Sequence, residues 1–158
     1  MKNKFMFVLV GLMLLSACGA PKSNAMEARD AWARAGLKDG NSAAYMLISN
    51  GTAQNDELVG VSSDAAKAVE IHLSQMGADG TMQMLPQEAI ALPAGGELEL
   101  KPGSYHVMLI GLVKDLNLGD EITLTLHFQI HEDITLTVPV KEAADMGGSG
   151  MDGHNSMP

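Results

Sequence analysis

"EITLTLHFQIHEDITLTVPV", residues 121–140, contains two runs in which apolar and polar residues alternate. The apolar residues that share a face are Ile122, Leu124, Leu126 and Phe128 in the first run, and Ile134, Leu136, Val138 and Val140 in the second. Because successive side chains of a strand point to opposite faces, each run predicts a strand with one buried face. The connection "QIHED" is short, so the two strands are predicted to form a β-hairpin.

Shorter apolar runs precede this hairpin and are separated by turn-forming residues. They include "YMLISN", which ends at Asn50-Gly51, then "DELVGVS", "AVEIHLS" and "GSYHVMLIGL". No long helical period is present, although Ser63–Ala68 could form one helical turn. Many short alternating strands at this spacing predict an all-β fold, an antiparallel β-sandwich, over residues 28–143.

The N-terminal residues have the pattern of an export signal. A basic start precedes the apolar run Phe5–Leu15, which is too short for a stable membrane anchor, and the run closes on "LSAC". This ending resembles a bacterial lipobox, which implies a signal segment 1–17, lipid on Cys18 and a tether over residues 18–27. The alternative is a plain secretory signal cleaved nearby. Both predict an extracytoplasmic protein, and the lipobox predicts a membrane-anchored lipoprotein, on the periplasmic side in a Gram-negative cell.

The composition argues against two classes of protein. Loss of Lys2 and Lys4 with the signal would leave eight basic against 19 acidic residues, a net charge of −11. Nucleic acid is therefore not an expected partner. Cys18 is the only cysteine in the chain, so the mature domain has no thiol for a disulfide. It also lacks the cysteine thiolate that a blue-copper electron carrier needs.

The last part of the chain, residues 144–158, reads "ADMGGSGMDGHNSMP". Glycine and polar residues dominate it and no apolar period exists, so we expect a disordered C-terminal tail. The tail contains Met146, Met151, His154 and Met157. These residues are either without function or part of a flexible metal-capturing arm, since tracts rich in His and Met can bind metal without folding first.

Two potential metal ligands lie two residues apart in "GSYHVMLIGL", residues 103–112. In an extended chain His106 and Met108 share one face and are about 7 Å apart, while Tyr105 and Val107 lie on the other face. An imidazole and a thioether at this spacing could hold one ion. They could equally be ordinary packing.

Two further segments offer ligands of the same kind. In "AVEIHLS" His72 lies with Glu70 opposite the apolar face, and in "GTMQML" Met82 and Met84 share a face. The alternative is that methionine fills the core and histidine is solvated, as is common. Thioether sulfur suits Cu(I), and imidazole suits copper in either oxidation state. A Met/His site without thiolate therefore indicates copper.

The spacing of these residues resembles the signature of the periplasmic copper chaperones called PCu(A)C. That signature is His, an optional Met, ten residues, Met, 21 residues and His-x-Met. Here His72, Met84, His106 and Met108 occupy its four positions without a gap. The flanking segments "AWARA", "AAYMLISN" and "GDEITLTLHF" agree with the family, so the resemblance covers about residues 29–141.

The resemblance implies a cupredoxin-like Greek-key β-sandwich in which these four residues hold Cu(I) near the surface. It also implies a chaperone and not an enzyme. Copper would pass to the copper subunit of cytochrome oxidase or to its assembly thiol protein. Met82 is a candidate accessory ligand, and the tail is a candidate site for Cu(II) or a second copper. Leu73 replaces the optional Met, and Leu85 stands where many members have Arg.

Two alternatives stay open. A copper storage or resistance lipoprotein would depend most on the tail and would need no delivery partner. A non-metal β-sandwich lipoprotein of the envelope would tolerate replacement of all four signature residues. His127 and His131 lie outside the signature and are expected to be solvated surface residues. The sequence contains no nucleophile–base pair with a distinctive local signature, so no catalysis is expected.

Overall fold

The computed structural model describes residues 24–142, and every regular element within that range is a β-strand. The strands are β1 (Met26–Arg34), β2 (Asn41–Asn50), β3 (Asp56–Ser62), β4 (Ala66–Met76), β5 (Met82–Gln87), β6 (Ile90–Leu92), β7 (Glu97–Leu100), β8 (Tyr105–Leu112), β9 (Glu121–Phe128) and β10 (Ile134–Lys141). The predicted hairpin is present as β9 and β10, antiparallel and with Leu124 opposite Leu136. The all-β prediction is confirmed.

One expectation about local structure is wrong. Ser63–Ala68 forms no helical turn, because Ala66 already begins β4. The Ser63 hydroxyl donates to the carbonyl of Thr123 and accepts the N–H of Ala65, which directs the chain into the strand. Ala65 and Ala66 are buried in the core, so tertiary packing outweighs the helical preference of alanine.

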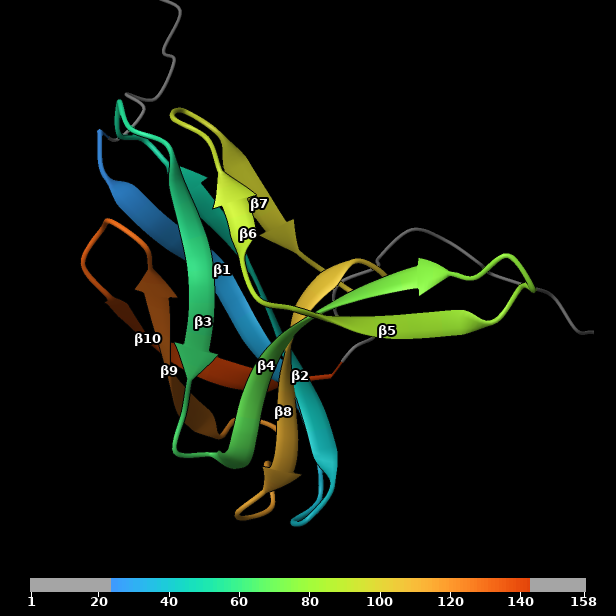
Figure 1. The fold of residues 1–158 in the computed structure, drawn as a ribbon. Helices are drawn as coiled ribbons and strands as arrows, with labels where there is room; N and C mark the ends of the chain where they lie inside the picture. The colour runs from blue at the N-terminus through green and yellow to red at the C-terminus, as the bar shows by residue number, and fades with distance from the viewer. Residues whose placement is uncertain (1–23, 143–158) are drawn as a thin grey trace, which may run out of the picture.

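The strands form a continuous path that folds over on itself (Figure 1). Along this path the order is β5-β4-β8-β2-β1-β10-β9-β3-β6, and β7 also pairs with β2. Most pairs are antiparallel, as predicted, but β1 runs parallel to β10 through Ala33 and Val140. The first and last strands therefore join the two halves of the sandwich. Neighbours such as β2 and β8 are far apart in sequence, which is the mark of crossover connections.

Both halves of the path contribute side chains to one hydrophobic core. The half made of β5, β4, β8, β2 and β1 contributes fully buried side chains that include Ile48, Val107 and Leu109. The half made of β10, β9, β3 and β6 contributes Leu58, Leu124, Leu126 and Val138. On β8 the core residues Val107 and Leu109 alternate with His106 and Met108, whose side chains therefore point to the opposite face of the sheet. One face of the β4–β8–β2–β1 sheet packs on the core, and we call its opposite side the outer face.

The buried carboxylate of Asp56, at the start of β3, forms hydrogen bonds with the backbone of the β9–β10 connection. Asp56 is 6% exposed and accepts hydrogen bonds from the backbone N–H groups of Glu57 (2.7 Å), Ile130 (3.0 Å) and His131 (2.9 Å). Burial by itself raises the pKa of Asp56, but the backbone donors favour the ionised form more strongly and hold the pKa below its ordinary value.

Replacing Asp56 with asparagine is expected to lower the free energy of unfolding at pH 7 by about 1–3 kcal/mol, because a buried charged acceptor is lost. Since the folded-state pKa is depressed, the stabilisation is complete above the unfolded-state pKa, which is about 3.9, and is lost as pH falls through the folded-state value. Denaturant unfolding from pH 7 to pH 2.5 measures both effects. The exposed Glu121→Gln is the control, and an Asp56→Asn profile parallel to wild type would contradict the assignment.

Candidate metal centre

The strand register brings the four signature residues to one face of the sheet. His72 on β4 lies directly opposite His106 on β8. Met108 follows two residues later on β8, and Met84 on β5 lies opposite Ser74, two residues beyond His72. Directly opposed residues of antiparallel strands project from the same face. The four side chains therefore share the outer face, although they come from three strands.

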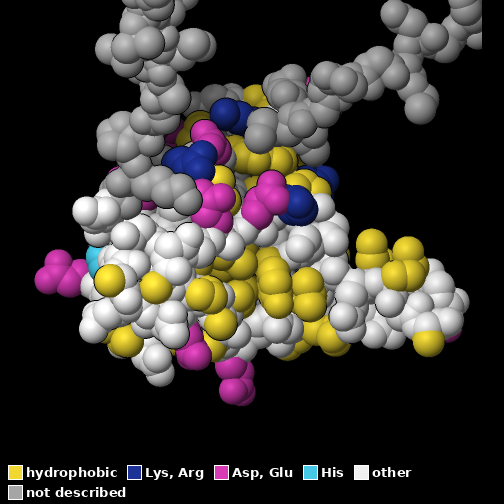
Figure 2. Space-filling model, turned by 90° about the horizontal axis from the view of Figure 1, so that it is seen from above, with side chains coloured by type: hydrophobic (Ala, Val, Ile, Leu, Met, Phe, Trp, Pro, Cys, Tyr) yellow, Lys and Arg dark blue, Asp and Glu magenta, His cyan; other side chains and the backbone are white. Residues whose placement is uncertain are grey.

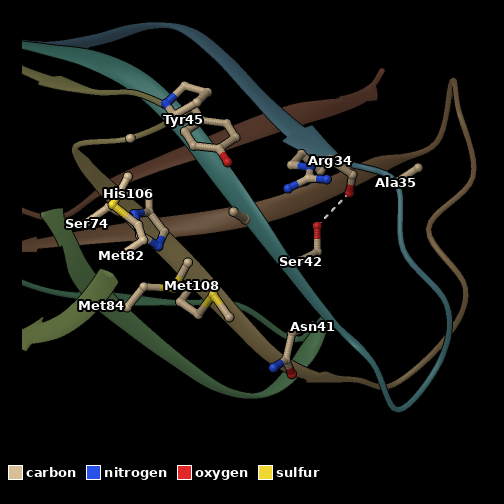
Figure 3. Close-up of a pocket in the computed structure, with 13 residues that line it drawn as sticks. Arg34, Ala35, Asn41, Ser42, Tyr45, Ser74, Met82, Met84, His106 and Met108 are labelled. Atoms are coloured by element: carbon tan, nitrogen blue, oxygen red, sulfur yellow. Dashed lines mark hydrogen bonds between the residues drawn. The ribbon is translucent and has the colours of Figure 1, made fainter. Parts of the chain in front are cut away.

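A pocket of about 350 Å³ lies on this face (Figure 3). Met82, Met84, His106 and Met108 all line it, so the pocket includes three of the signature residues and the candidate accessory ligand. Its remaining wall includes Tyr45 from β2 and Arg34 from the end of β1. His72 does not line the pocket but lies beside it, with its ring centroid 5.9 Å from that of His106.

The two kinds of candidate ligand differ in exposure. His106 is 4% exposed, whereas Met82 and Met84 are 57% and 55% exposed. Both methionines belong to β5, in the hairpin that projects from the sandwich (Figure 1). From above, Figure 2 shows apolar side chains on this projection at the right of the molecule. The site thus has a buried imidazole at its base and accessible sulfur at its rim.

Hydrogen bonding fixes which nitrogen of His106 is free. Its Nδ1 lies 3.0 Å from the carbonyl oxygen of Ser104. A carbonyl can only accept, so Nδ1 carries the proton in this bond and Nε2 keeps its lone pair. Such a second contact is the usual way in which proteins orient a metal-binding imidazole.

His72 has the opposite arrangement. Its Nε2 lies 2.7 Å from a carboxylate oxygen of Glu70, and its Nδ1 is buried with no hydrogen-bond partner among the residues that the structure describes. Glu70 is also the residue directly opposite Met108. Within residues 24–142 no group of three or more His, Cys, Asp or Glu is placed to hold a metal. A metal centre in this part of the protein would therefore depend on the thioethers.

Aromatic residues that the sequence did not single out support the buried side of the site. Tyr45 is 5% exposed, and its ring centroid lies 6.4 Å from that of His106. Trp32 on β1 packs on Tyr45 with centroids 4.5 Å apart. Both residues stood in the quoted segments "AWARA" and "AAYMLISN". Tyr45 lies near His106 because β2 pairs with β8, and no local sequence pattern reveals this pairing.

The two histidines outside the signature lie away from the pocket. His127 is partly exposed and bonds Ser62 through Nε2 and Asp133 through Nδ1, each at 2.8 Å. The order Ser–His–Asp is that of a hydrolase triad, but it lies on a strand surface and lines no part of the pocket. His131 lies in the β9–β10 connection, with its ring against Phe128.

Several predicted features lie outside the described residues. They are the signal segment 1–17, Cys18, and the tail ligands Met146, Met151, His154 and Met157. Among residues 24–142, no helix has the length and apolar character needed to cross a membrane.

Comparison with solved structures defines the class of this fold. The copper-bound PCuAC domain from PmoF2 aligns with a TM-score of 0.62 and 27% identity, covering 74% of this chain and 92% of that domain. The solution structure of Cu(I)-bound DR1885 from Deinococcus radiodurans aligns with a TM-score of 0.55 and 28% identity, covering 80% of this chain and 84% of that protein. The fold is that of a PCuAC domain, which confirms the resemblance seen in the sequence.

The family follows from the sequence comparisons. The family model described as "Putative lipoprotein LpqE-like" matches residues 26–140, and the chain belongs to this family. A relative from Leifsonia xyli subsp. xyli, named "Putative lipoprotein Lxx21020", is 32% identical over 123 residues, 77% of this chain and 72% of the relative. The "Uncharacterized protein RP573" of Rickettsia prowazekii is 34% identical over 119 residues, 72% of this chain and 64% of that protein.

Proposed function

We propose that this protein is an extracytoplasmic copper chaperone that binds Cu(I) through His72, Met84, His106 and Met108. The observation that carries the proposal is the register of β5, β4 and β8, which gathers these four side chains on one face beside a pocket. The likeness to a copper-bound PCuAC domain and to a Cu(I)-bound protein supports the same cargo.

The chemistry of the side chains fits Cu(I) better than a hard cation. Thioether sulfur is a soft ligand, whereas Mg²⁺ and Ca²⁺ prefer carboxylate and carbonyl oxygen. The buried Nδ1 of His72 has no hydrogen-bond partner in the described part of the chain, so an imidazole lone pair is available there. The Nε2 of His106 is likewise left free by the bond from Nδ1 to Ser104.

Release to a partner is supported by the position of the sulfur atoms. Met84 is more than half exposed on the projecting hairpin, so an incoming ligand could displace it first while His106 still holds the ion. A thiolate acceptor would bind Cu(I) more strongly than these neutral ligands, because it adds charge as well as softness. The copper subunit of cytochrome oxidase, or the thiol protein that assembles it, is the recipient that we propose.

Two observations support the proposed location, namely the family to which the chain belongs and the pattern of its N-terminal residues. The family is one of lipoproteins, and "LSAC" ends in the cysteine that would carry the lipid. We infer that Cys18 anchors the domain to a membrane surface outside the cytoplasm.

A storage role for the tail is the second candidate, and one feature of the fold favours it. The final residue of β10, Lys141, pairs with Arg34, which lines the pocket. The chain therefore leaves the described part beside the site. The tail follows directly in sequence on residues beside the site. A second copper would be held there by Met146, Met151, His154 or Met157.

Titration of the chain from residue 19 to 158 with Cu(I), against a coloured chelator and without oxygen, tests the proposal. We expect one tight equivalent, with quenching of Trp32, because this residue is the only tryptophan and contacts the site through Tyr45. A chain ending at residue 142 should keep that equivalent if delivery is the function. A second equivalent present only with the tail would support storage. Absence of tight binding in both chains would refute the copper proposal.

A further inference from the structure

We propose that Glu70 is a positioning residue of the copper site, an inference that rests on the proposed function. Its carboxylate holds the Nε2–H of His72, so that His72 offers Nδ1 to Cu(I) while His106 offers Nε2. The same carboxylate supplies the negative charge that the ligands lack. The two imidazoles therefore bind one ion through different nitrogens.

The first argument is the hydrogen bond between the two side chains. Nε2 of His72 lies 2.7 Å from Oε2 of Glu70, and an ionised carboxylate can only accept. Nε2 therefore carries the proton, and Nδ1 carries the lone pair when the ring is neutral. The His72 side chain is 13% exposed and the Glu70 side chain 47%, so the bond lies at the edge between the protein and the solvent.

The second argument is the unpaired nitrogen. Nδ1 of His72 is buried and has no hydrogen-bond partner among residues 24–142. Buried polar atoms in folded proteins are almost always satisfied, so an exception requires an explanation. A bound cation would satisfy this lone pair. The ring of His72 also lies against that of His106, so an ion between them could be reached by both residues.

The third argument is charge. Two neutral imidazoles and two thioethers leave the single positive charge of Cu(I) uncompensated. Glu70 lies opposite Met108 and two residues from His72, so it adjoins two of the four proposed ligands. Among the ion pairs of residues 24–142, its partner is His72 and not a lysine or arginine. A carboxylate that accepts from the outer nitrogen of a metal-bound imidazole also raises its donor strength.

Nitrogen-15 NMR of the imidazole rings tests the assignment on the chain from residue 19 to 158. Without metal, His72 is expected as the Nε2–H tautomer. Addition of Cu(I) should shift the Nδ1 resonance of His72 and the Nε2 resonance of His106, while the proton on Nε2 of His72 remains. Loss of the proton from Nε2 of His72 on addition of Cu(I) would overturn the proposal and leave the copper function standing.

Variants separate the hydrogen bond from the charge. Glu70→Gln is expected to weaken Cu(I) binding about 10–100-fold, the range typical of outer-shell partners, and to keep one equivalent. Glu70→Ala should in addition yield a mixture of His72 tautomers in the metal-free protein. Glu99→Gln is the matched control, because this exposed carboxylate on β7 pairs with Lys101.

Failure of this proposal and failure of the copper function are distinguishable. Unchanged affinity in both Glu70 variants, with wild type still binding one equivalent, would overturn the role of Glu70 alone. Absence of tight binding by wild type, with the Nε2–H tautomer of His72 intact, would overturn the copper function. In that case the Glu70–His72 bond would be a structural contact only.

Discussion

Replacement of Met84 and Met108 together by alanine is expected to lower the affinity for Cu(I) by more than about 100-fold. Loss of a residue that only supports a metal ligand typically lowers metal affinity by about 10–100-fold, and loss of two ligands should lower it further. The two side chains approach the pocket from β5 and β8, on either side of the β4 strand that carries His72. Their loss would leave two imidazoles and no proposed thioether ligand. Imidazole alone is less selective for Cu(I), so discrimination against Cu(II) and Zn(II) should fall as well.

Competition with a Cu(I) chelator measures the affinity. Because truncation of Met84 could also alter the structure of the projecting hairpin, the control variant must remove apolar side chains from the same hairpin without removing a proposed ligand. Met76→Ala/Leu85→Ala removes two exposed apolar side chains from β4 and β5 that do not line the pocket. This control should bind Cu(I) as wild type does. Equal weakening in both double variants would mean that hairpin structure, and not thioether ligation, governs binding.

Met82 is a third thioether that could bind Cu(I) in the Met84→Ala/Met108→Ala variant. It lines the same pocket as Met84 and is equally exposed. If residual Cu(I) binding in the Met84→Ala/Met108→Ala variant disappears when Met82 is also replaced, Met82 is an accessory ligand. If the residual binding remains, the two histidines account for it.

The sequence predicted the fold because alternation is a local signal. In the β9–β10 hairpin every second residue is apolar, and Leu124, Leu126 and Val138 are fully buried as that pattern requires. The parallel pairing of β1 with β10 was not predictable in the same way, because it joins Ala33 to Val140 across the whole domain. Strand identity is a local property, whereas strand order depends on tertiary packing.

In the candidate site, too, the sequence predicted what depends on a single strand but not what depends on the pairing of strands. Alternation put His106 and Met108 on one face, and His72 with Glu70 on another, but could not bring the two pairs together. Their juxtaposition in the structure depends on the β4–β8 register. The burial of His106 was also not apparent, because a histidine opposite a core face usually lies in solvent. Tyr45, from a strand more than 50 residues earlier, lies beside it.

Leu109→Ala is expected to lower the free energy of unfolding by about 2–5 kcal/mol and to leave Cu(I) affinity nearly unchanged. Leu109 is fully buried and adjoins Met108 on β8, but the two side chains point to opposite faces of the strand. Truncation would leave a cavity among core residues, such as Val107, whereas the backbone that positions the ligands keeps its pairing with β2 and β4.

Denaturant unfolding and Cu(I) competition on the same samples separate these two effects. Leu118→Ala is the matched control, because this leucine is 55% exposed and its truncation should change stability by no more than about 0.5 kcal/mol. Since ligand binding stabilises the folded state, Cu(I) should raise the stability of Leu109→Ala and wild type by equal amounts. A smaller increase in Leu109→Ala would mean that core packing sets the geometry of the site, and that the two faces of β8 are not independent.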